Sequence, residues 1–268
     1  MVNEFLLETL REEGKRLKIP PHKDRALIRE YLQTKIIYYL YGFSLAEKLS
    51  FIGGTSLRIL RDLDRFSEDL DFDNLGLNFR QIKPLFLKIK NALEKEGFEM
   101  NYEMKKTNDS GIGELKFEEL LFKLGISSHS EEKLSIRLNY TTPKTKPKNE
   151  ILALNRFGMV QNVLTNTAEF LLSQKIRAIL TRKDPQPRDF YDLVWFLSQR
   201  IKPDQGLFSE IKVKNEKEIC QKLEKIYFEK IKPKIKIFKK RLAPFLIDER
   251  KVYYLDVFPE ILKKELRD

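Results

Sequence analysis

Apolar residues recur every three or four positions in long stretches of this chain, which is the spacing of one face of an α-helix. In the N-terminal half, this spacing predicts helices over residues 3–18, 24–46 and 79–96. Pro20 ends the first of these helices, Asp24 is placed to cap the second, and Gly97 stops the third. Amphipathic helices are therefore expected throughout the first hundred residues.

Between these helices, shorter runs alternate apolar and polar residues, as strands of a half-buried sheet do. The alternation predicts strands at Phe51-Ile52 and around residues 69–72, 98–105, 115–121 and 132–140. A turn-rich segment, residues 107–111, separates two of them. Strands interleaved with helices indicate an α+β fold, in which helices pack against a mixed sheet.

A basic, proline-containing segment over residues 143–149 marks the expected boundary between two lobes. Beyond it the apolar spacing predicts mainly helices, the first capped by Thr167 and the last a lysine-rich stretch over 212–241. We therefore expect residues 1–145 to form a core with N-terminal helices, and residues 146–268 to form a mainly helical lobe.

Two adjacent glycines, Gly53 and Gly54, directly follow the first predicted strand, where they favour a tight turn. Thr55 or Ser56 can then cap a short helix and leave backbone N–H groups directed at the mouth of the turn. Free N–H groups at the start of a helix are a favourable site for phosphate. These four residues are therefore a candidate phosphate-binding turn.

The next predicted strand carries two carboxylates, Asp69 and Asp71, two positions apart. Side chains at this spacing project from the same face of a strand, so the two acids lie side by side while Leu70 and Phe72 enter the core. Like charges held so close need a cation between them, and Mg²⁺ prefers oxygen ligands. Either motif alone has a simpler explanation, a solvated strand or a purely geometric turn, but both occur here in order.

The bulk composition narrows the class of protein. A formal net charge of +11 over 268 residues fits a polyanionic partner, although a lysine-rich surface that only keeps the protein in solution explains it equally well. The single cysteine, Cys220, excludes an internal disulfide, and His22 and His129 lie too far apart in sequence to support a histidine-based site. Without a membrane-length apolar run or a signal peptide, we expect a soluble, cytoplasmic protein.

The glycine turn and the aspartate pair together resemble the nucleotidyltransferase core of the DNA polymerase β superfamily. The segment GGTSLRILRDLDRFSEDLDF more narrowly resembles the AbiEii/AbiGii family of bacterial toxins, which includes the MenT-type toxins. This resemblance implies a polymerase β-like mixed sheet with flanking helices, and a helical lobe that completes the active site. It also implies phosphate contacts for Ser67 and Arg65, although Arg65 is equally suited to packing or a salt bridge.

A second segment, LLSQKIRAILTRKDPQPRDFYDL, is similar to the family's lysine helix followed by R-D-x-x-D. By this resemblance Lys175 holds the triphosphate, and a compact point charge there suits a leaving pyrophosphate. Asp189 or Asp192 would complete the site, and the sequence does not rank them. By itself the pattern is an ordinary set of surface charges, with Arg188 and Asp192 as an i,i+4 ion pair.

One acid of the polymerase β-like pattern is missing. Such sites often place a third carboxylate on a later strand, whereas the polar face of residues 134–140 carries Ser135, Arg137 and Asn139. Asn139 is then a weak oxygen ligand, or an acid of the second segment replaces the carboxylate, or the site holds one metal, or the site is degenerate. Arg137 contacts either a phosphate or a neighbouring glutamate.

The resemblance implies an enzyme that needs Mg²⁺, for which Mn²⁺ is a possible substitute, and that transfers a nucleoside monophosphate from a nucleoside triphosphate to an acceptor hydroxyl. The implied acceptor is tRNA. The C-terminal lysines either contact its phosphate backbone or are simply a solvated face of a helix. The implied role is the toxin of a type IV-like toxin–antitoxin or abortive-infection system, with a cognate antitoxin.

Two other functions fit the same motifs. A small-molecule nucleotidyltransferase that modifies antibiotics shares the turn and the acids, but expects an acidic acceptor pocket that the charge of +11 does not favour. A nucleotide- or RNA-binding module with a degenerate site fits the missing third acid. Its binding would survive the change Asp69→Asn without any product formation.

Overall fold

The computed structural model describes residues 4–107 and 109–266, so residue 3 of the first expected helix and Asn108 of the expected turn lie outside the described residues. The chain divides into two compact units. The first comprises Met1–Asp62, Phe66–Lys144 and Asn149–Thr165, and the second Leu63–Arg65, Thr145–Lys148 and Asn166–Asp268.

The first unit is built on a seven-stranded mixed sheet in the order β3-β4-β5-β2-β1-β7-β6. β2 pairs antiparallel with β1 and parallel with β5, while β3, β4 and β5 form an antiparallel meander. The predicted α+β class with a mixed sheet is therefore confirmed. The strands are β1 Leu49–Ile52, β2 Leu70–Asn74, β3 Met100–Lys106, β4 Ser110–Phe117, β5 Leu134–Thr141, β6 Asn149–Arg156 and β7 Met159–Asn166.

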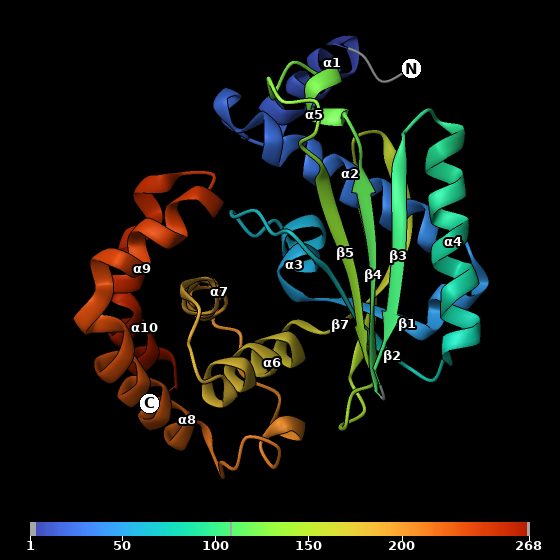
Figure 1. Ribbon diagram of the computed structural model, residues 1–268. Coiled ribbons are helices and arrows are strands. Elements are labelled where there is room, and N and C mark those ends of the chain that lie inside the picture. Colours follow the sequence, from blue (N-terminus) through green and yellow to red (C-terminus); the bar gives the residue numbers. More distant parts are fainter. Residues whose placement is uncertain (1–3, 108, 267–268) are drawn as a thin grey trace. The chain divides into compact units, whose positions relative to one another are not determined.

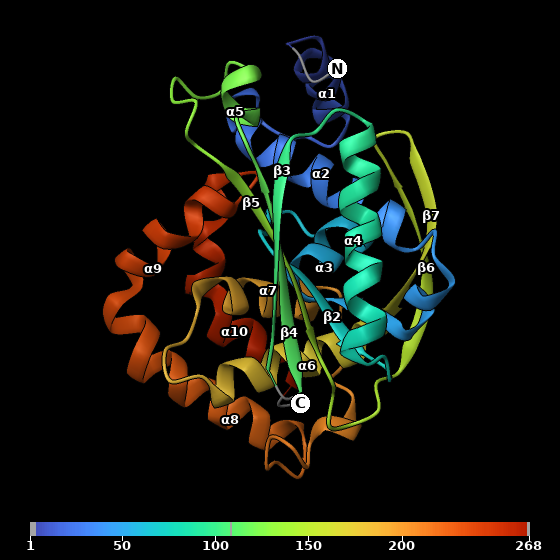
Figure 2. The same cartoon turned by 45° about the vertical axis from the view of Figure 1, so that its right-hand side comes forward.

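Helices flank this sheet, and α4 runs along its β3 side in both views (Figures 1 and 2). Phe86 of α4 packs edge-on against Tyr140 of β5, with ring centroids 6.4 Å apart. The glycines of β4 make room for these rings, because a Cβ at Gly111 would lie 2.4 Å from Tyr140. The helices of this unit are α1 Glu4–Arg16, α2 Asp24–Leu40, α3 Gly53–Arg61, α4 Phe79–Lys95 and α5 Leu120–Lys123, with 3₁₀ turns η1 Pro21–Lys23 and η2 Ser44–Lys48.

Three local expectations were wrong. Asp24 does not cap α2 with its side chain but lies in its first turn, where its Oδ1 accepts a hydrogen bond from Arg11 Nε at 3.1 Å. α2 ends at Leu40 rather than at residue 46, and a 3₁₀ turn follows. The strand expected over 115–121 instead runs from Ser110 to Phe117. It starts earlier because Gly111, which indicated a turn in the sequence, lies in the strand and makes room for a neighbouring ring.

β6 and β7 form a hairpin of the first unit, whereas the sequence placed residues 146–268 in one helical lobe. The two turn residues, Phe157 and Gly158, have φ of +52° and +72°. This geometry is typical of a two-residue hairpin turn that needs positive φ at both positions. Phenylalanine rarely adopts that conformation, so the sequence carried no strong turn signal here.

The second unit is helical. Its core contains the rings of Phe190, Tyr227 and Phe258, and the ring centroids of Phe190 and Phe258 are 5.0 Å apart. Cys220 is buried in this unit. Thr167 occupies the cap position of α6 without a side-chain capping bond. The helices are α6 Ala168–Thr181, α7 Pro187–Ser198, α8 Glu216–Ile226, α9 Ile235–Leu242 and α10 Tyr254–Leu266, with single turns η3 Gln205–Leu207, η4 Tyr227–Ile231, η5 Lys232–Lys234, η6 Ala243–Phe245 and η7 Glu249–Tyr253. Within the described residues, no helix is long and apolar enough to cross a membrane.

A buried carboxylate holds α2, α3 and β6 of the first unit together. Glu30 is 2% exposed and accepts hydrogen bonds from Arg58 Nε at 2.9 Å and Arg156 Nη1 at 2.8 Å. Arg156 also donates to the carbonyl oxygens of Ile59 and Arg58. Burial lowers the pKa of Arg156, although the charge of Glu30 opposes this change. The cluster is stable only as a set, because removal of one ion leaves the others buried without compensation.

The change Glu30→Gln is therefore expected to lower the free energy of unfolding by about 3–5 kcal/mol. Urea denaturation followed by circular dichroism would measure it. The matched control is Glu103→Gln, which breaks an exposed pair with Lys116 and is expected to cost less than about 1 kcal/mol. Equal losses in the two variants would contradict the central role of Glu30.

Candidate active site

The glycine turn leads straight into a helix. α3 begins at Gly53 with Ile52 as its cap residue, so Thr55 and Ser56 lie inside the first turn and do not cap it as expected. The reason is a longer-range bond, because the Thr55 hydroxyl donates to the carbonyl oxygen of Asp69. The first N–H groups of α3 still lack intrahelical acceptors. Any phosphate contact of this turn is therefore expected from its backbone N–H groups.

Gly53 also lies against one of the paired acids. A Cβ at this position would lie 2.5 Å from Asp71 Oδ2, and the residue has a φ of +79°. The register of β1 and β2 accounts for the contact, because Ile52 is directly opposite Asp71. Gly53 is therefore required both by its backbone conformation and by the carboxylate beside it.

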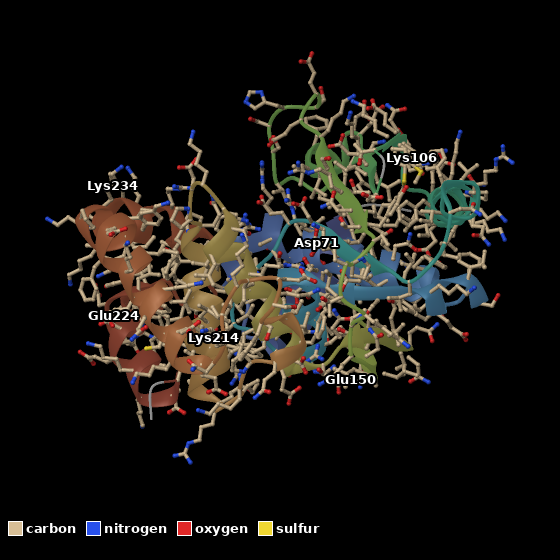
Figure 3. The ribbon with its side chains drawn as sticks, turned by 90° about the horizontal axis from the view of Figure 1, so that it is seen from below. Asp71, Lys106, Glu150, Lys214, Glu224 and Lys234 are labelled. Carbon is tan, nitrogen blue, oxygen red and sulfur yellow. The ribbon has the colours of Figure 1, made fainter. Side chains whose placement is uncertain are left out.

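Asp71 lies on β2 and Asp69 immediately precedes that strand (Figure 3 labels Asp71). Each carboxylate receives one hydrogen bond from β5, the parallel neighbour of β2. Asn139 Nδ2 donates to Asp71 Oδ1 at 2.9 Å, and Arg137 Nε donates to Asp69 Oδ1 at 3.1 Å. The acid that Arg137 contacts is thus an aspartate, not the glutamate considered from the sequence.

The described residues contain no cluster of three or more aspartate, glutamate, histidine or cysteine side chains that could hold a metal ion. Glu114 lies on the next strand, but it accepts a hydrogen bond from Ser135 and pairs with Lys116 at 3.3 Å. The Ser135 hydroxyl, helped by Lys116, lowers the pKa of Glu114. Two carboxylates fit Mg²⁺, which typically takes one or two acids from a protein and completes its shell with phosphate oxygens and water.

A buried glutamine that the sequence analysis did not single out fixes the chain just before these acids. Gln33 of α2 donates through Nε2 to the carbonyl oxygens of Ser67 at 3.1 Å and Glu68 at 2.9 Å. Gln33 is 2% exposed among apolar helix residues. A polar residue at a buried position of a helix is the signal that would have identified it.

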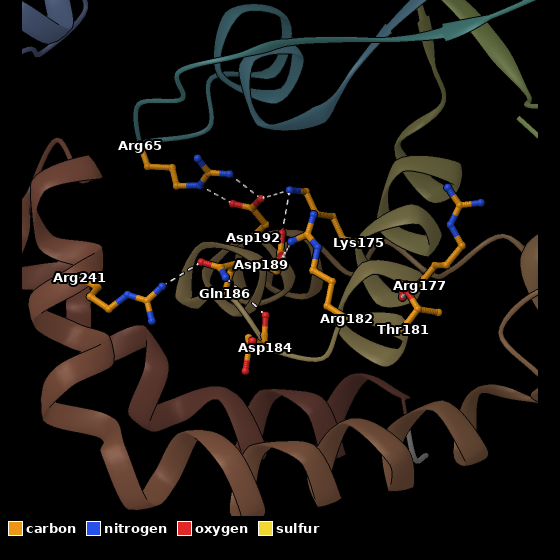
Figure 4. A network of polar contacts seen from close by, with 10 residues as sticks. All are labelled: Arg65, Lys175, Arg177, Thr181, Arg182, Asp184, Gln186, Asp189, Asp192 and Arg241. Carbon is orange, nitrogen blue, oxygen red and sulfur yellow. Dashed lines mark hydrogen bonds and ion pairs between the residues drawn. The ribbon is translucent and has the colours of Figure 1, made fainter. Parts of the chain in front are cut away.

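The other candidate residues form a chain of alternating charges within the second unit (Figure 4). Arg65, which belongs to this unit, donates through two nitrogens to Asp192, each bond 2.6 Å long. Lys175 Nζ lies 2.8 Å from Asp192 Oδ2 and 3.1 Å from Asp189 Oδ1. Arg182 pairs with the other oxygen of Asp189. The structure therefore contains the salt bridge that was one of the alternatives for Arg65.

The contacts of this chain favour the ionised forms of Asp192 and Lys175. Burial alone would raise the pKa of Asp192, but the charges of Arg65 and Lys175 outweigh burial and lower it. Burial likewise opposes the charged form of Lys175, whose pKa is nevertheless raised by Asp192 and Asp189. The guanidinium of Arg188 lies over the ring of Phe245, 4.5 Å from its centroid. Asp192 is thus a fully buried anion with two cationic neighbours.

Comparisons with known proteins address the fold and the family. The family described as "Nucleotidyl transferase AbiEii toxin, Type IV TA system" matches residues 38–261. The structure is similar to MenT4, a nucleotidyltransferase toxin from Mycobacterium tuberculosis, with a TM-score of 0.60 and 16% identity over 97% of this chain and 89% of that one. It is also similar to JHP933 from Helicobacter pylori, with a TM-score of 0.57 and 18% identity over 91% and 94% of the two chains. At these identities the similarity shows the fold alone. A comparison with curated proteins gave no match.

The contact between Gly53 and Asp71 leads to a first test of the metal site. The change Gly53→Ala is expected to displace the Asp71 carboxylate and weaken Mn²⁺ binding about 10-fold or more, as loss of a group that orients a metal ligand does. Isothermal titration calorimetry would measure it. The control is Gly97→Ala, because Gly97 has a φ of +92° but nothing within 4 Å of an added Cβ. Equal Mn²⁺ affinities in the two variants would contradict the positioning role of Gly53.

A second test compares Asp192, which is buried between two cations, with Asp71, which lies near another carboxylate. Asp192→Asn leaves Arg65 and Lys175 buried without their shared anion, so we expect a loss of about 3–5 kcal/mol in the free energy of unfolding. Asp71→Asn instead relieves repulsion between neighbouring carboxylates, and its stability is expected to equal or exceed that of the wild type. Urea denaturation of both variants would show this. A strongly destabilised Asp71→Asn protein would contradict the assignment of that acid to ligand binding.

Proposed function

The chain belongs to the AbiEii family of nucleotidyltransferase toxins, and on that premise we propose that it transfers a nucleoside monophosphate from a nucleoside triphosphate to an acceptor hydroxyl of tRNA. The observation that carries the proposal is the contact of the Asp71 carboxylate with Gly53, the first residue of α3. This contact supports the proposal, because it keeps the backbone N–H groups at the start of α3 close to a carboxylate.

In this proposal, the chain's own residues mainly bind and orient. The first N–H groups of α3 hold the phosphates of the nucleotide. Asp69 and Asp71 are the residues that would hold Mg²⁺, which when bound neutralises charge on the reacting phosphate and the leaving pyrophosphate. Asn139 fixes the orientation of the Asp71 carboxylate by donating to it. Gln33 fixes the backbone just before Asp69. Catalysis of this kind depends on positioning and charge neutralisation.

A nucleic-acid acceptor is supported by the charge of the second unit. The twelve residues from Lys230 to Arg241 contain seven lysines and arginines and no acid. Lys232 of η5 and Lys236 and Lys240 of α9 are exposed at four-residue spacing, and the two like charges within α9 destabilise that helix slightly. A row of cations that persists in spite of this cost fits contact with a phosphate backbone. Figure 3 labels Lys234, which lies within this segment.

The role of the second charge chain stays a prediction. By family resemblance, Lys175 binds the triphosphate and Asp189 or Asp192 completes the site. A toxin role also implies a cognate antitoxin, and we propose one here, in a type IV-like toxin–antitoxin or abortive-infection system. Toxicity on expression that disappears in the Asp69→Ala variant is the expected behaviour of such a protein.

A binding module with a degenerate site is the alternative that one specific observation favours. That observation concerns Asn139, which lies opposite Asp71 on β5. Asn139 donates a hydrogen bond to Asp71, whereas a third acid at this position would bind a metal ion. The alternative expects nucleotide binding without product. The transfer assay below therefore decides between the two functions.

We expect wild-type protein with Mg²⁺ and total tRNA to incorporate label from at least one α-³²P nucleoside triphosphate. Asp71→Ala is expected to reduce incorporation by about 100-fold or more, because charge stabilisation at the reacting phosphate is lost. The matched control is Asp248→Asn in the second unit, where Asp248 pairs with the exposed Arg250, and it is expected to retain activity. Incorporation that persists in Asp71→Ala, or nucleotide binding without any product, would contradict the proposed transferase.

A further inference from the structure

We propose that Arg137 makes metal binding at Asp69 and Asp71 depend on the nucleotide. Its guanidinium neutralises Asp69 in the ligand-free protein and moves to the triphosphate when nucleotide binds. This inference rests on the proposed function, since it assumes that the two acids bind a divalent cation. It adds a positioning residue that couples the binding of the two ligands.

The position of Arg137 suits this exchange. It lies on β5, where alternate residues face the side of the sheet that carries Asp69 and Asp71. Its Nε is 3.1 Å from Asp69 Oδ1, and the two side chains are 55% and 34% exposed. The pair is therefore half-solvated, in contrast to the buried pair of Arg65 and Asp192, whose side chains are 2% and 0% exposed. A half-solvated pair is weak enough for another cation to displace it.

The acid directly opposite Arg137 on β4 has other partners. Glu114 is in register with Arg137, but its carboxylate accepts from Ser135 and lies 3.3 Å from Lys116. Arg137 instead contacts Asp69, which immediately precedes β2, the strand that flanks β5 on the side opposite to β4. Its charge thus lies at the carboxylate that would also bind the metal ion in this proposal.

The consequence for metal binding follows from the charges alone. A divalent cation that binds without nucleotide has to displace the guanidinium from Asp69 and then tolerate it nearby. A triphosphate offers Arg137 a better partner, because guanidinium and phosphate form paired, charge-assisted hydrogen bonds. Nucleotide therefore clears Asp69 for the metal, and by linkage the metal strengthens nucleotide binding by the same factor.

The test is Mn²⁺ affinity by titration calorimetry, with and without a saturating α,β-methylene nucleoside triphosphate, each of the four bases being used in turn. Without nucleotide, Arg137→Gln is expected to bind Mn²⁺ about two- to five-fold more tightly than wild type, which corresponds to the strength of a half-exposed ion pair. With nucleotide, this advantage disappears or reverses. Arg137→Lys, which keeps the charge but loses the paired hydrogen bonds, is expected to resemble wild type without nucleotide and to show weaker coupling.

The control is Lys116→Gln, which removes one positive charge from the adjacent strand without touching Asp69 and is expected to bind Mn²⁺ as wild type does. Unchanged or weaker nucleotide-free Mn²⁺ binding in Arg137→Gln would overturn the inference and leave the transferase intact. The same holds for an equal gain in Lys116→Gln, which would indicate a general field effect. Absence of Mn²⁺ binding to wild type in both conditions would overturn the proposed function together with this inference.

Discussion

The carboxylate of Asp71 lies against the first residue of α3, and the site depends on this contact. Because an added Cβ at Gly53 would lie 2.5 Å from Asp71 Oδ2, the position excludes every residue with a side chain unless the acid moves. A second bond, from the Thr55 hydroxyl to the carbonyl oxygen of Asp69, fastens the same turn to the same strand. The start of α3 and the two acids are thus held in place by contacts within one unit. Such rigid placement is what a reaction driven by orientation requires.

The two sets of candidate acids have opposite surroundings. Asp192 is a fully buried anion between Arg65 and Lys175, and removal of any member leaves an uncompensated charge. Asp69 is partly solvated, and its carboxylate accepts a hydrogen bond from the exposed Arg137. A divalent cation competes easily with the second arrangement and poorly with the first. This contrast favours Asp69 and Asp71 as metal ligands, and it gives Asp192 an evident part in the stability of the second unit.

What the sequence could predict was local. The strand that carries Asp71 follows from side-chain alternation over four residues, and the helix that starts at Gly53 follows from two adjacent glycines. The cap assigned to Thr55 was wrong because its true acceptor is fourteen residues away, a separation that a local pattern does not register. The β6–β7 hairpin was missed because Phe157 adopts positive φ, which its residue type does not indicate. The partner of Arg137 could not be predicted either, because only the register of β2 and β5, two strands distant in sequence, brings Arg137 to Asp69.

The missing third acid becomes understandable in this register. Asp71 and Asn139 are paired across parallel strands, so an acid at the second position would place another negative charge directly beside the first. The asparagine instead donates to Asp71, and Arg137, two residues before it on the same face, donates to Asp69. β5 therefore supplies one donor to each acid, and the pair is tolerated before any metal arrives. Under the proposed function, two carboxylates would hold a cation whose remaining ligands would come from the triphosphate and water. In such a site, nucleotide and metal are expected to bind as mutually dependent ligands, because neither alone satisfies the charges that the fold assembles.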